Sequence, residues 1–261
     1  MRGLLLLYGE SFRDGGQLSR LRDTKFSFIP QQTATNSHIE FCKYIKEKYD
    51  ISMDIIISTH NTKYETQLKK WYNPHKYISH ESNTIKDAEK LVQNAVNVID
   101  RKYEFIFLTR MDIFLKPPFF KKFNPNWSTI KFFSQNTTLW QCGMDGPFPV
   151  VNHTCEFIPK QYFQVLFNIG VDHLSWRHYH EIFHIPNSKM GFMVNTYHDA
   201  DSFKDFNPYY KMVSRPESKV WLDRGKKINK SFGKTRKCNI NSLLWNKKLW
   251  NKTKHFPFKI N

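Results

Sequence analysis

Three dense apolar runs set the strongest limit on how this chain can fold. They read GLLLLYG at residues 3–9, MDIIISTH at 53–60 and YEFIFLTR at 103–110. Continuous apolar runs rich in β-branched and aromatic residues are typical of strands that are buried on both faces of a parallel sheet. The sequence therefore predicts a sheet whose first strands are covered on both sides.

Two helical patterns separate these runs. In residues 36–49 the apolar stripe consists of Ile39, Cys42, Ile45 and Tyr49, with Asn36 or Ser37 as the N-cap. In residues 83–103 it consists of Ile85, Ala88, Leu91, Val92, Ala95 and Val98. The alternation of strand and helix predicts an α/β domain with a mainly parallel central sheet flanked by helices. Further along, residues 130–134 and 190–198 are predicted strands, and residues 158–170 are a predicted helix.

Polar residues gather where each predicted strand ends. The first strand is followed by YGESFRDGG, the second by STHNT and the third by TRMD. In a doubly wound sheet the ligand site lies at the carboxyl ends of the strands, so these segments should converge on one crevice. Asp112 has the chemistry of a ligand for Mg²⁺ or Mn²⁺, and Arg110 could hold a phosphate or orient that carboxylate. A structural salt bridge between the two residues is the alternative.

The charge of the chain favours anionic ligands. Its 40 Lys and Arg residues exceed its 23 Asp and Glu residues, for a formal net charge of +17. Basic residues crowd positions 211–261, where Glu217 and Asp223 are the acids. A nucleic-acid-binding module is therefore an alternative function, but no zinc-finger, RNP or KH signature accompanies the charge, so nucleic acid is not the expected partner.

Membrane and secretion signals are weak. The opening MRGLLLLYG has an apolar core of four leucines, and no run approaches the ~20 apolar residues of a membrane span. The four cysteines show no close pairing, which favours a reducing compartment. We expect no membrane span and a cytoplasmic location.

A His-Glu-x-x-His sequence at residues 180–184 is a second alternative. On a helix this pattern binds zinc and is typical of metalloproteases. Pro186 should end such a helix too early, and no Gly-x-x-His continuation follows. A zinc metalloprotease is therefore not the favoured interpretation.

The order of the motifs resembles a known family. LLLYGESFRDGG, then DIIISTHNT, then a long helix leading into YEFIFLTRMDIFLKP resembles nucleotide-sugar-dependent glycosyltransferases of polysaccharide gene clusters and large DNA viruses. The resemblance spans about residues 2–160. It implies a single GT-A-like, Rossmann-like domain over residues 1–261, with a nucleotide-binding half at 1–120. Residues 121–261 would form the acceptor-side half and the basic C-terminal segment.

The resemblance also implies which residues bind the donor. These are Gly9, Glu10, Ser11, Arg13, Thr59, His60, Arg110 and Arg215, with Lys211 as an alternative to Arg215. Asp112 would stand where many such enzymes carry an Asp-x-Asp metal motif, and His198 would be a later metal ligand, so Mn²⁺ or Mg²⁺ is the expected cofactor. Because Arg110 occupies the first Asp position, a weaker metal site and no metal site both stay open.

The resemblance implies a general base in a later acidic segment, CGMDGPFPVVN. Asp145 is the first candidate and Glu156 the second, because transfer with inversion needs a carboxylate to take the proton of the acceptor hydroxyl. The expected enzyme is a hexosyl- or pentosyltransferase that uses a UDP-sugar, such as UDP-xylose or a neutral hexose donor, on a glycan hydroxyl. By analogy it would build a viral glycan in the host cytoplasm. An inactive, lectin-like descendant is a further alternative, and nothing in the sequence indicates the oligomeric state.

Overall fold

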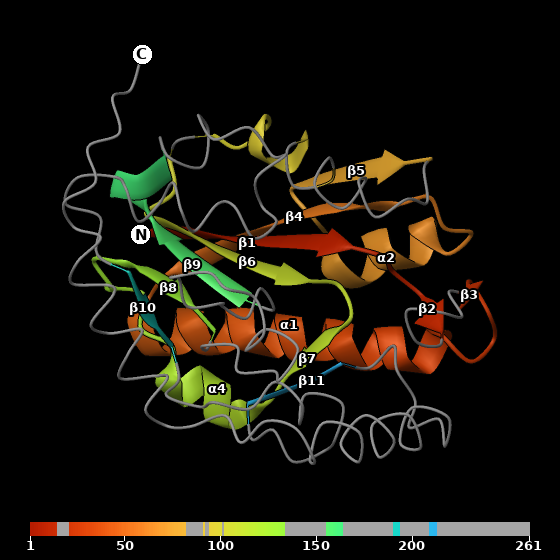
Figure 1. Cartoon of the computed structure of the whole chain (residues 1–261), viewed down its shortest axis with the longest axis horizontal. Coiled ribbons are helices and arrows are strands. Elements are labelled where there is room, and N and C mark those ends of the chain that lie inside the picture. Colours follow the sequence, from red (N-terminus) through yellow and green to blue (C-terminus); the bar gives the residue numbers. More distant parts are fainter. Residues whose placement is uncertain are drawn as a thin grey trace, which may run out of the picture.

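The computed structural model describes residues 1–14, 21–81, 91, 94–100, 102–133, 155–163, 190–193 and 209–212. Its centre is a seven-stranded sheet in the order β10-β8-β9-β6-β1-β4-β5 (Figure 1). The strands are β1 (Arg2–Gly9), β4 (Ser52–His60), β5 (Lys76–His80), β6 (Phe105–Arg110), β8 (Ile130–Phe132), β9 (Cys155–Pro159) and β10 (Met190–Phe192). Among these strands β9 alone runs antiparallel to its neighbours. The prediction of a mainly parallel, Rossmann-like α/β sheet is confirmed.

Helices cover both faces of the sheet. One face packs against α1 (Phe28–Tyr49), α2 (Glu65–Tyr72) and α4 (Pro117–Lys122). The other face packs against the helical residues 94–96 and against Phe163, which follows the 3-10 helix η1 (Lys160–Tyr162). In Figure 1 α1 and α4 lie below the sheet. The sheet is therefore the middle of three layers.

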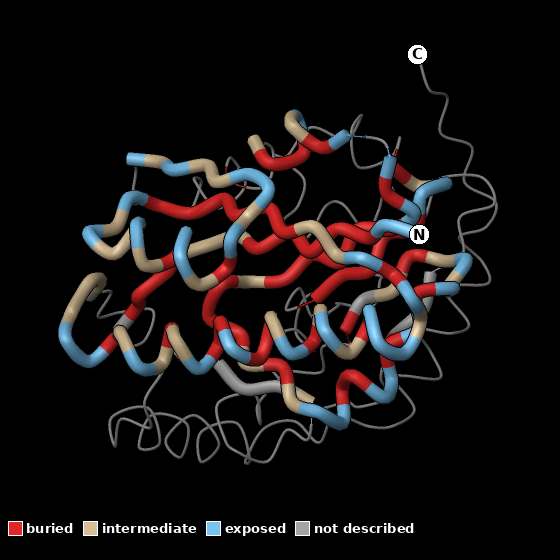
Figure 2. Tube along the Cα trace, turned by 180° about the vertical axis from the view of Figure 1, so that it is seen from behind, coloured by how far each residue is buried: buried red, intermediate tan, exposed pale blue. Residues whose placement is uncertain are grey.

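The sequence of β1 is continuously apolar because both faces of the sheet are covered at this strand. Leu5 and Leu7 point into the core on the α1 side, whereas Leu4 and Leu6 point into the core on the opposite side. All four side chains have no exposed surface, and the middle of the sheet is mostly buried in Figure 2. Alternating side chains of a central strand must both be apolar when both faces are covered.

Phenylalanine rings hold α1 against β6. Phe41 of α1 lies 5.1 Å from the ring of Phe107 and 5.0 Å from that of Phe123, between ring centroids. Phe105 of the same strand packs against Phe157 of β9 at 5.2 Å. These rings fix the position of β6, whose carboxyl end carries Arg110.

Helix α1 differs from the prediction at its start. It begins at Phe28, with Ser27 at the N-cap, so the predicted caps at Asn36 and Ser37 are wrong. Pro30 lies in the first turn, where its missing N–H costs no helical hydrogen bond. The polar stretch after Pro30 hid this start from a search for apolar periodicity.

The buried stripe of α1 is also rotated from the predicted one. It runs through Gln31, Ala34, Thr35, Ser37, His38, Phe41 and Ile45. Of the four residues in the predicted stripe, Ile45 is fully buried. Ile39 and Cys42 are half-buried at the border of the observed stripe.

Other elements were predicted with mixed success. Strands β8 and β10 lie within the predicted strands at 130–134 and 190–198. A helix was predicted at residues 158–170. Its first two residues end strand β9 and the next three form the 3-10 helix η1, so the predicted helix is wrong at its start. Strands β5 and β9 and helix α2 were not predicted.

Strands from both predicted halves of the chain form one sheet, because β9 pairs with β6 and β8 pairs with β9. The division into residues 1–120 and 121–261 within a single domain stays a prediction. In the described part of the chain, no helix has the length and apolar character needed to cross a bilayer.

Two short antiparallel pairs lie outside the main sheet. Strands β2 (Arg13–Asp14) and β3 (Leu21–Arg22) pair after β1. Strands β7 (Ile113–Leu115) and β11 (Tyr210–Met212) pair after β6. Both pairs begin at the carboxyl edge of the central strands.

Burial of His38 should make the free energy of unfolding depend on pH in the acidic range. Burial lowers the pKa of His38 to about 3, and its Nδ1 lies 2.8 Å from the hydroxyl of Tyr72. The unfolded chain therefore takes up this proton near the ordinary pKa of about 6.5, before the folded chain does. The stabilising effect is complete above about pH 6.5 and is lost as the pH falls toward 3.

We expect the free energy of unfolding of the wild type to fall by about 2 kcal/mol between about pH 6.5 and 5 relative to the His38→Gln variant. Urea denaturation at the two pH values measures this difference. The control is Thr33→Val at an exposed, non-titrating position of the same helix, which should keep the pH dependence of the wild type. Equal pH dependence in wild type and His38→Gln would contradict the assignment.

Candidate functional site

The order of the strands defines where a ligand should bind. From β1 the chain moves outward to β4 and β5, and then returns to place β6 on the other side of β1. The order reverses between β1 and β6, and open α/β sheets bind ligands at the carboxyl ends of the strands beside such a point. Tyr8 is paired with Arg110, and Gly9 with Thr59, so the predicted segments after β1, β4 and β6 meet here.

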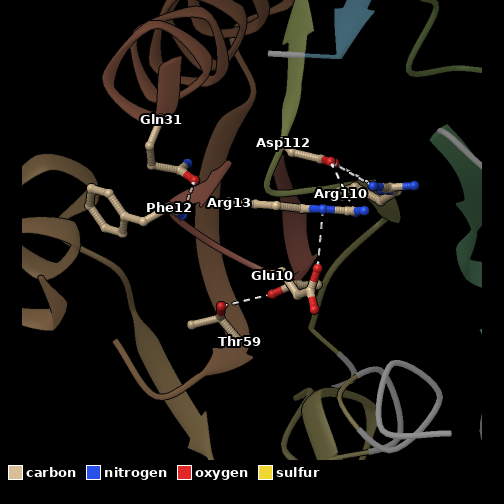
Figure 3. Close-up of polar contacts among 8 residues, drawn as sticks. Glu10, Phe12, Arg13, Gln31, Thr59, Arg110 and Asp112 are labelled. Carbon is tan, nitrogen blue, oxygen red and sulfur yellow. Dashed lines mark hydrogen bonds and ion pairs between the residues drawn. The ribbon is translucent and has the colours of Figure 1, made fainter. Parts of the chain in front are cut away.

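Arg110 and Asp112 form a bidentate ion pair at the end of β6. Nε of Arg110 donates to Oδ1 of Asp112 at 2.8 Å, and Nη2 donates to Oδ2 at 2.6 Å (Figure 3). Burial lowers the pKa of Arg110, but the negative charge of Asp112 and the hydrogen bonds to it outweigh burial, so the pKa of Arg110 is raised. Two parallel hydrogen bonds of this kind fix the orientation of a guanidinium group.

A second arginine approaches the same carboxylate from the loop after β1. Nη1 of Arg13 lies 4.0 Å from Oδ2 of Asp112, and its Nε lies 3.3 Å from Oε2 of Glu10. The side chain of Arg13 is 5% exposed. Glu10, Arg13, Asp112 and Arg110 thus form one chain of alternating charges across the ends of β1 and β6 (Figure 3).

Thr59 joins β4 to this loop. Its hydroxyl donates to the carbonyl oxygen of Gly9 at 2.7 Å and lies 3.1 Å from Oγ of Ser11. Gly9 has a φ of 102°, a conformation that side-chain-bearing residues rarely adopt. A Cβ at Gly9 would meet no atom of the described residues within 4 Å, so this side of the backbone is open to close approach.

Phe12 is the anchor of the loop after β1. Its φ is 47°, which is an uncommon and costly conformation for a bulky residue. The ring is fully buried, 4.7 Å from Tyr64 and 5.8 Å from Phe28 between centroids. The strain is therefore balanced by burial of the ring, which directs the neighbouring side chains of Ser11 and Arg13 inward.

Gln31 of α1 ties the two loops together. Its Oε1 accepts a hydrogen bond from the backbone N–H of Phe12 at 3.0 Å, and its Nε2 donates to the carbonyl oxygen of Met111 at 3.1 Å. Gln31 is only 2% exposed, so each of these bonds satisfies a group that water does not reach. One side chain thus fixes the spacing between the segment after β1 and the Arg110–Asp112 segment.

Asp23 provides a further tie toward β4. Its backbone N–H donates to the carbonyl oxygen of Phe12 at 3.0 Å. Its carboxylate accepts hydrogen bonds from the hydroxyl of Thr62 and, at 3.1 Å, from the backbone N–H of Lys63. The segments that follow β1, β3 and β4 are therefore connected by hydrogen bonds.

Glu156 and His60 lie on the sheet face opposite α1. Glu156 is 6% exposed and stands opposite Leu108, at the end of β9 that adjoins the carboxyl end of β6. Burial, together with the charge of Glu156, raises the pKa of Tyr8 well above its usual range. His60 ends β4 beside His80 and alternates with Thr59, so the two predicted donor-binding residues of β4 point to different faces.

Several predicted residues fall outside the described part of the chain. These are Asp145, His198, Arg215 and the His-Glu-x-x-His sequence at 180–184. Most of the basic segment at 211–261 also lies outside it. Met212 is placed: it pairs with Ile113 in the β7–β11 sheet, so β11 lies beside the strand that follows Asp112.

Asp112 was predicted to bind a divalent metal, and this role stays a prediction. Both carboxylate oxygens accept hydrogen bonds from Arg110, and Arg13 is the next charged group. In the described ranges, no group of three or more His, Cys, Asp or Glu side chains could hold a metal ion. His198, the other predicted ligand, is not among these residues.

Three residues that position the site were not found from the sequence. Gln31 bonds to Met111 across 80 positions, and no local pattern indicates such a contact. Phe12 and Asp23 have positive φ values that only the folded backbone reveals. The GG pair after Asp14 signals a turn in this region but does not identify the residues that hold it.

Comparisons with known proteins give similarity at the level of structure alone. The sequence matches no protein-family model and no curated protein. A mutant of Drosophila β1,4-galactosyltransferase 7, solved with manganese, UDP-Gal and xylobiose, is similar over 93% of this chain and 78% of its own, at 9% identity and a TM-score of 0.44.

Two other solved structures also resemble this chain. The inositol-1-phosphate CTP transferase of T. maritima covers 91% of this chain and 98% of its own, at 10% identity and a TM-score of 0.45. A glycosyltransferase involved in glycosylation of the major capsid of PBCV-1 covers 73% and 80%, at 10% identity and a TM-score of 0.35. At TM-scores below 0.5 these similarities define no family for this chain.

Gln31 predicts a clear loss of stability when its amide is removed. Gln31→Leu leaves the buried N–H of Phe12 and the buried carbonyl of Met111 unsatisfied, which should cost about 2–5 kcal/mol of unfolding free energy. The matched control is Gln32→Leu, one position along α1 and half-buried, which should cost under about 1 kcal/mol. Chemical denaturation of both variants measures the difference, and equal losses would contradict the bridging role.

Proposed function

We propose that this chain is a glycosyltransferase that binds a nucleotide diphosphate sugar at the ends of β1, β4 and β6 and transfers the sugar to a glycan hydroxyl. The observation that carries the proposal is the convergence of Arg13 and Arg110 at the point where the strand order reverses. Guanidinium groups suit phosphate because their planar donors match its oxygens.

The strand order supports a GT-A-like assignment. Numbered along the chain, the seven strands of the sheet lie in the order 3-2-1-4-6-5-7 from β5 to β10, with the sixth antiparallel. The resemblance of the sequence to nucleotide-sugar-dependent glycosyltransferases points in the same direction. UDP is the proposed nucleotide, with xylose or a neutral hexose as the sugar.

The chemistry is a substitution at the anomeric carbon of the donor. The acceptor hydroxyl oxygen forms a bond to this carbon, the bond from the carbon to the diphosphate oxygen breaks, and the nucleoside diphosphate leaves with the electron pair. The acceptor proton goes to a carboxylate base, for which Glu156 and Asp145 are the candidates. Arg110 and Arg13 stabilise the charge that develops on the leaving diphosphate.

A ligand panel tests the proposal. Thermal unfolding is measured with UDP, other nucleoside diphosphates and UDP-sugars, each with and without Mn²⁺. A ligand at about 100 times its Kd adds about 2.7 kcal/mol and raises Tm visibly. Uridine is the control, because it lacks the diphosphate and should give little shift. No shift with any diphosphate nucleotide at millimolar concentration would contradict the proposal.

Glu156 can be tested separately from donor binding. If Glu156 is the general base, Glu156→Gln should lower kcat by about 10²–10⁴ while leaving the affinity for UDP unchanged. Glu104→Gln is the control, because Glu104 is an exposed acid that pairs with Lys160 next to the opposite end of β6. An unchanged kcat in Glu156→Gln would remove it from this role and leave Asp145 as the candidate.

A further inference from the structure

The Arg110–Asp112 pair uses only one edge of the guanidinium group. Asp112 accepts from Nε and Nη2 of Arg110. A guanidinium carries five N–H donors, so three, including both of Nη1, are directed elsewhere. In Figure 3 the tip of the Arg110 side chain points away from the carboxylate of Asp112. The outer edge of the Arg110 guanidinium group is therefore directed away from Asp112.

The two side chains also differ in their exposure to solvent. The side chain of Arg110 is 26% exposed, whereas that of Asp112 is 4% exposed. An incoming ligand consequently meets the guanidinium before it meets the carboxylate. Asp112 lies on the buried side of Arg110, where its two hydrogen bonds orient the guanidinium group.

The charged groups beside Asp112 are the guanidinium groups of Arg110 and Arg13, and Arg13 also pairs with Glu10. Arg13 approaches Oδ2 of Asp112 to 4.0 Å, so two guanidinium groups share one carboxylate. A divalent cation on Asp112 would share both carboxylate oxygens with Arg110 and would lie beside the positive charges of Arg110 and Arg13. A diphosphate would instead be attracted to both arginines and could accept hydrogen bonds from the outer edge of Arg110.

We propose that Arg110 and Arg13 neutralise the donor diphosphate without a divalent metal, and that Asp112 is a positioning residue that orients Arg110. The inference rests on the proposed function, since it specifies how the same site holds the nucleotide. It also explains why an arginine at the first position of the Arg-x-Asp motif is compatible with diphosphate binding.

The first test is the affinity for UDP, measured by calorimetry on the full chain in EDTA and again with saturating Mn²⁺. We expect Kd values that agree within about twofold, because the arginines are permanently charged. Binding that appears only with Mn²⁺ would overturn the inference and leave the proposed function intact. Absence of UDP binding under both conditions would overturn both.

The second test is a double-mutant cycle between Asp112 and Arg110, measured in EDTA. Arg110→Met should weaken UDP binding by about tenfold or more, and Asp112→Asn should also weaken it. If Asp112 acts through Arg110, adding Asp112→Asn to Arg110→Met should change Kd by less than about twofold. Additive losses, or unchanged affinity in Arg110→Met, would overturn the positioning role.

Two further variants guard against a loss of folding. Arg110→Lys keeps the charge without the planar fork, and it should bind UDP more weakly than the wild type but more tightly than Arg110→Met. Arg2→Met removes another Arg–Asp pair at the opposite end of β1, in which Nη2 of Arg2 donates to both oxygens of Asp54. This variant should leave the Kd for UDP unchanged. If Arg2→Met weakens UDP binding as much as Arg110→Met does, the loss of any Arg–Asp pair is enough to impair binding, and the inference is overturned.

Discussion

The parallel pairing of β1 with β6 is the constraint on which the rest of the site depends. It sets Tyr8 beside Arg110, so the loops that follow the two strands begin at the same edge of the sheet. Because both strands are buried on both faces, neither can shift its register without exposing apolar side chains. Phe41, Phe107 and Phe123 hold β6 in place from the α1 side. The hydrophobic core thereby fixes where the polar residues meet.

The polar contacts above this edge are built on strain and burial. Phe12 keeps an unfavourable backbone conformation because its ring is buried and Gln31 accepts its N–H. The same Gln31 side chain binds the carbonyl of Met111, between Arg110 and Asp112. Loops held in this way have little freedom to rearrange, and preorganised donors stabilise developing charge without the cost of reorientation. This is the physical link between the fold and the proposed transfer reaction.

The sequence predicted the elements whose signal is local. Strands β1, β4 and β6 were found because buried parallel strands are apolar without interruption, and the placement of Arg110 and Asp112 followed from the strand that precedes them. Strand β5 was missed because it lies at the sheet edge and is only half-buried, so KYISH lacks that signal. Gln31 and Phe12 could not be predicted, because their roles arise from contacts and backbone angles that exist only once α1, β1 and β6 are packed together. The start of α1 was missed because its first three turns bury polar side chains.

A crystal structure of the protein with UDP tests the central claim most directly. The account predicts that the diphosphate lies between the segment after β1, at residues 9–13, and the Arg110–Asp112 segment, with its oxygens accepting hydrogen bonds from Arg110. Gln31 should keep its bonds to Phe12 and Met111 in that complex. A nucleotide bound elsewhere on the molecule, with the Arg13 and Arg110 side chains not in contact with phosphate, would contradict it.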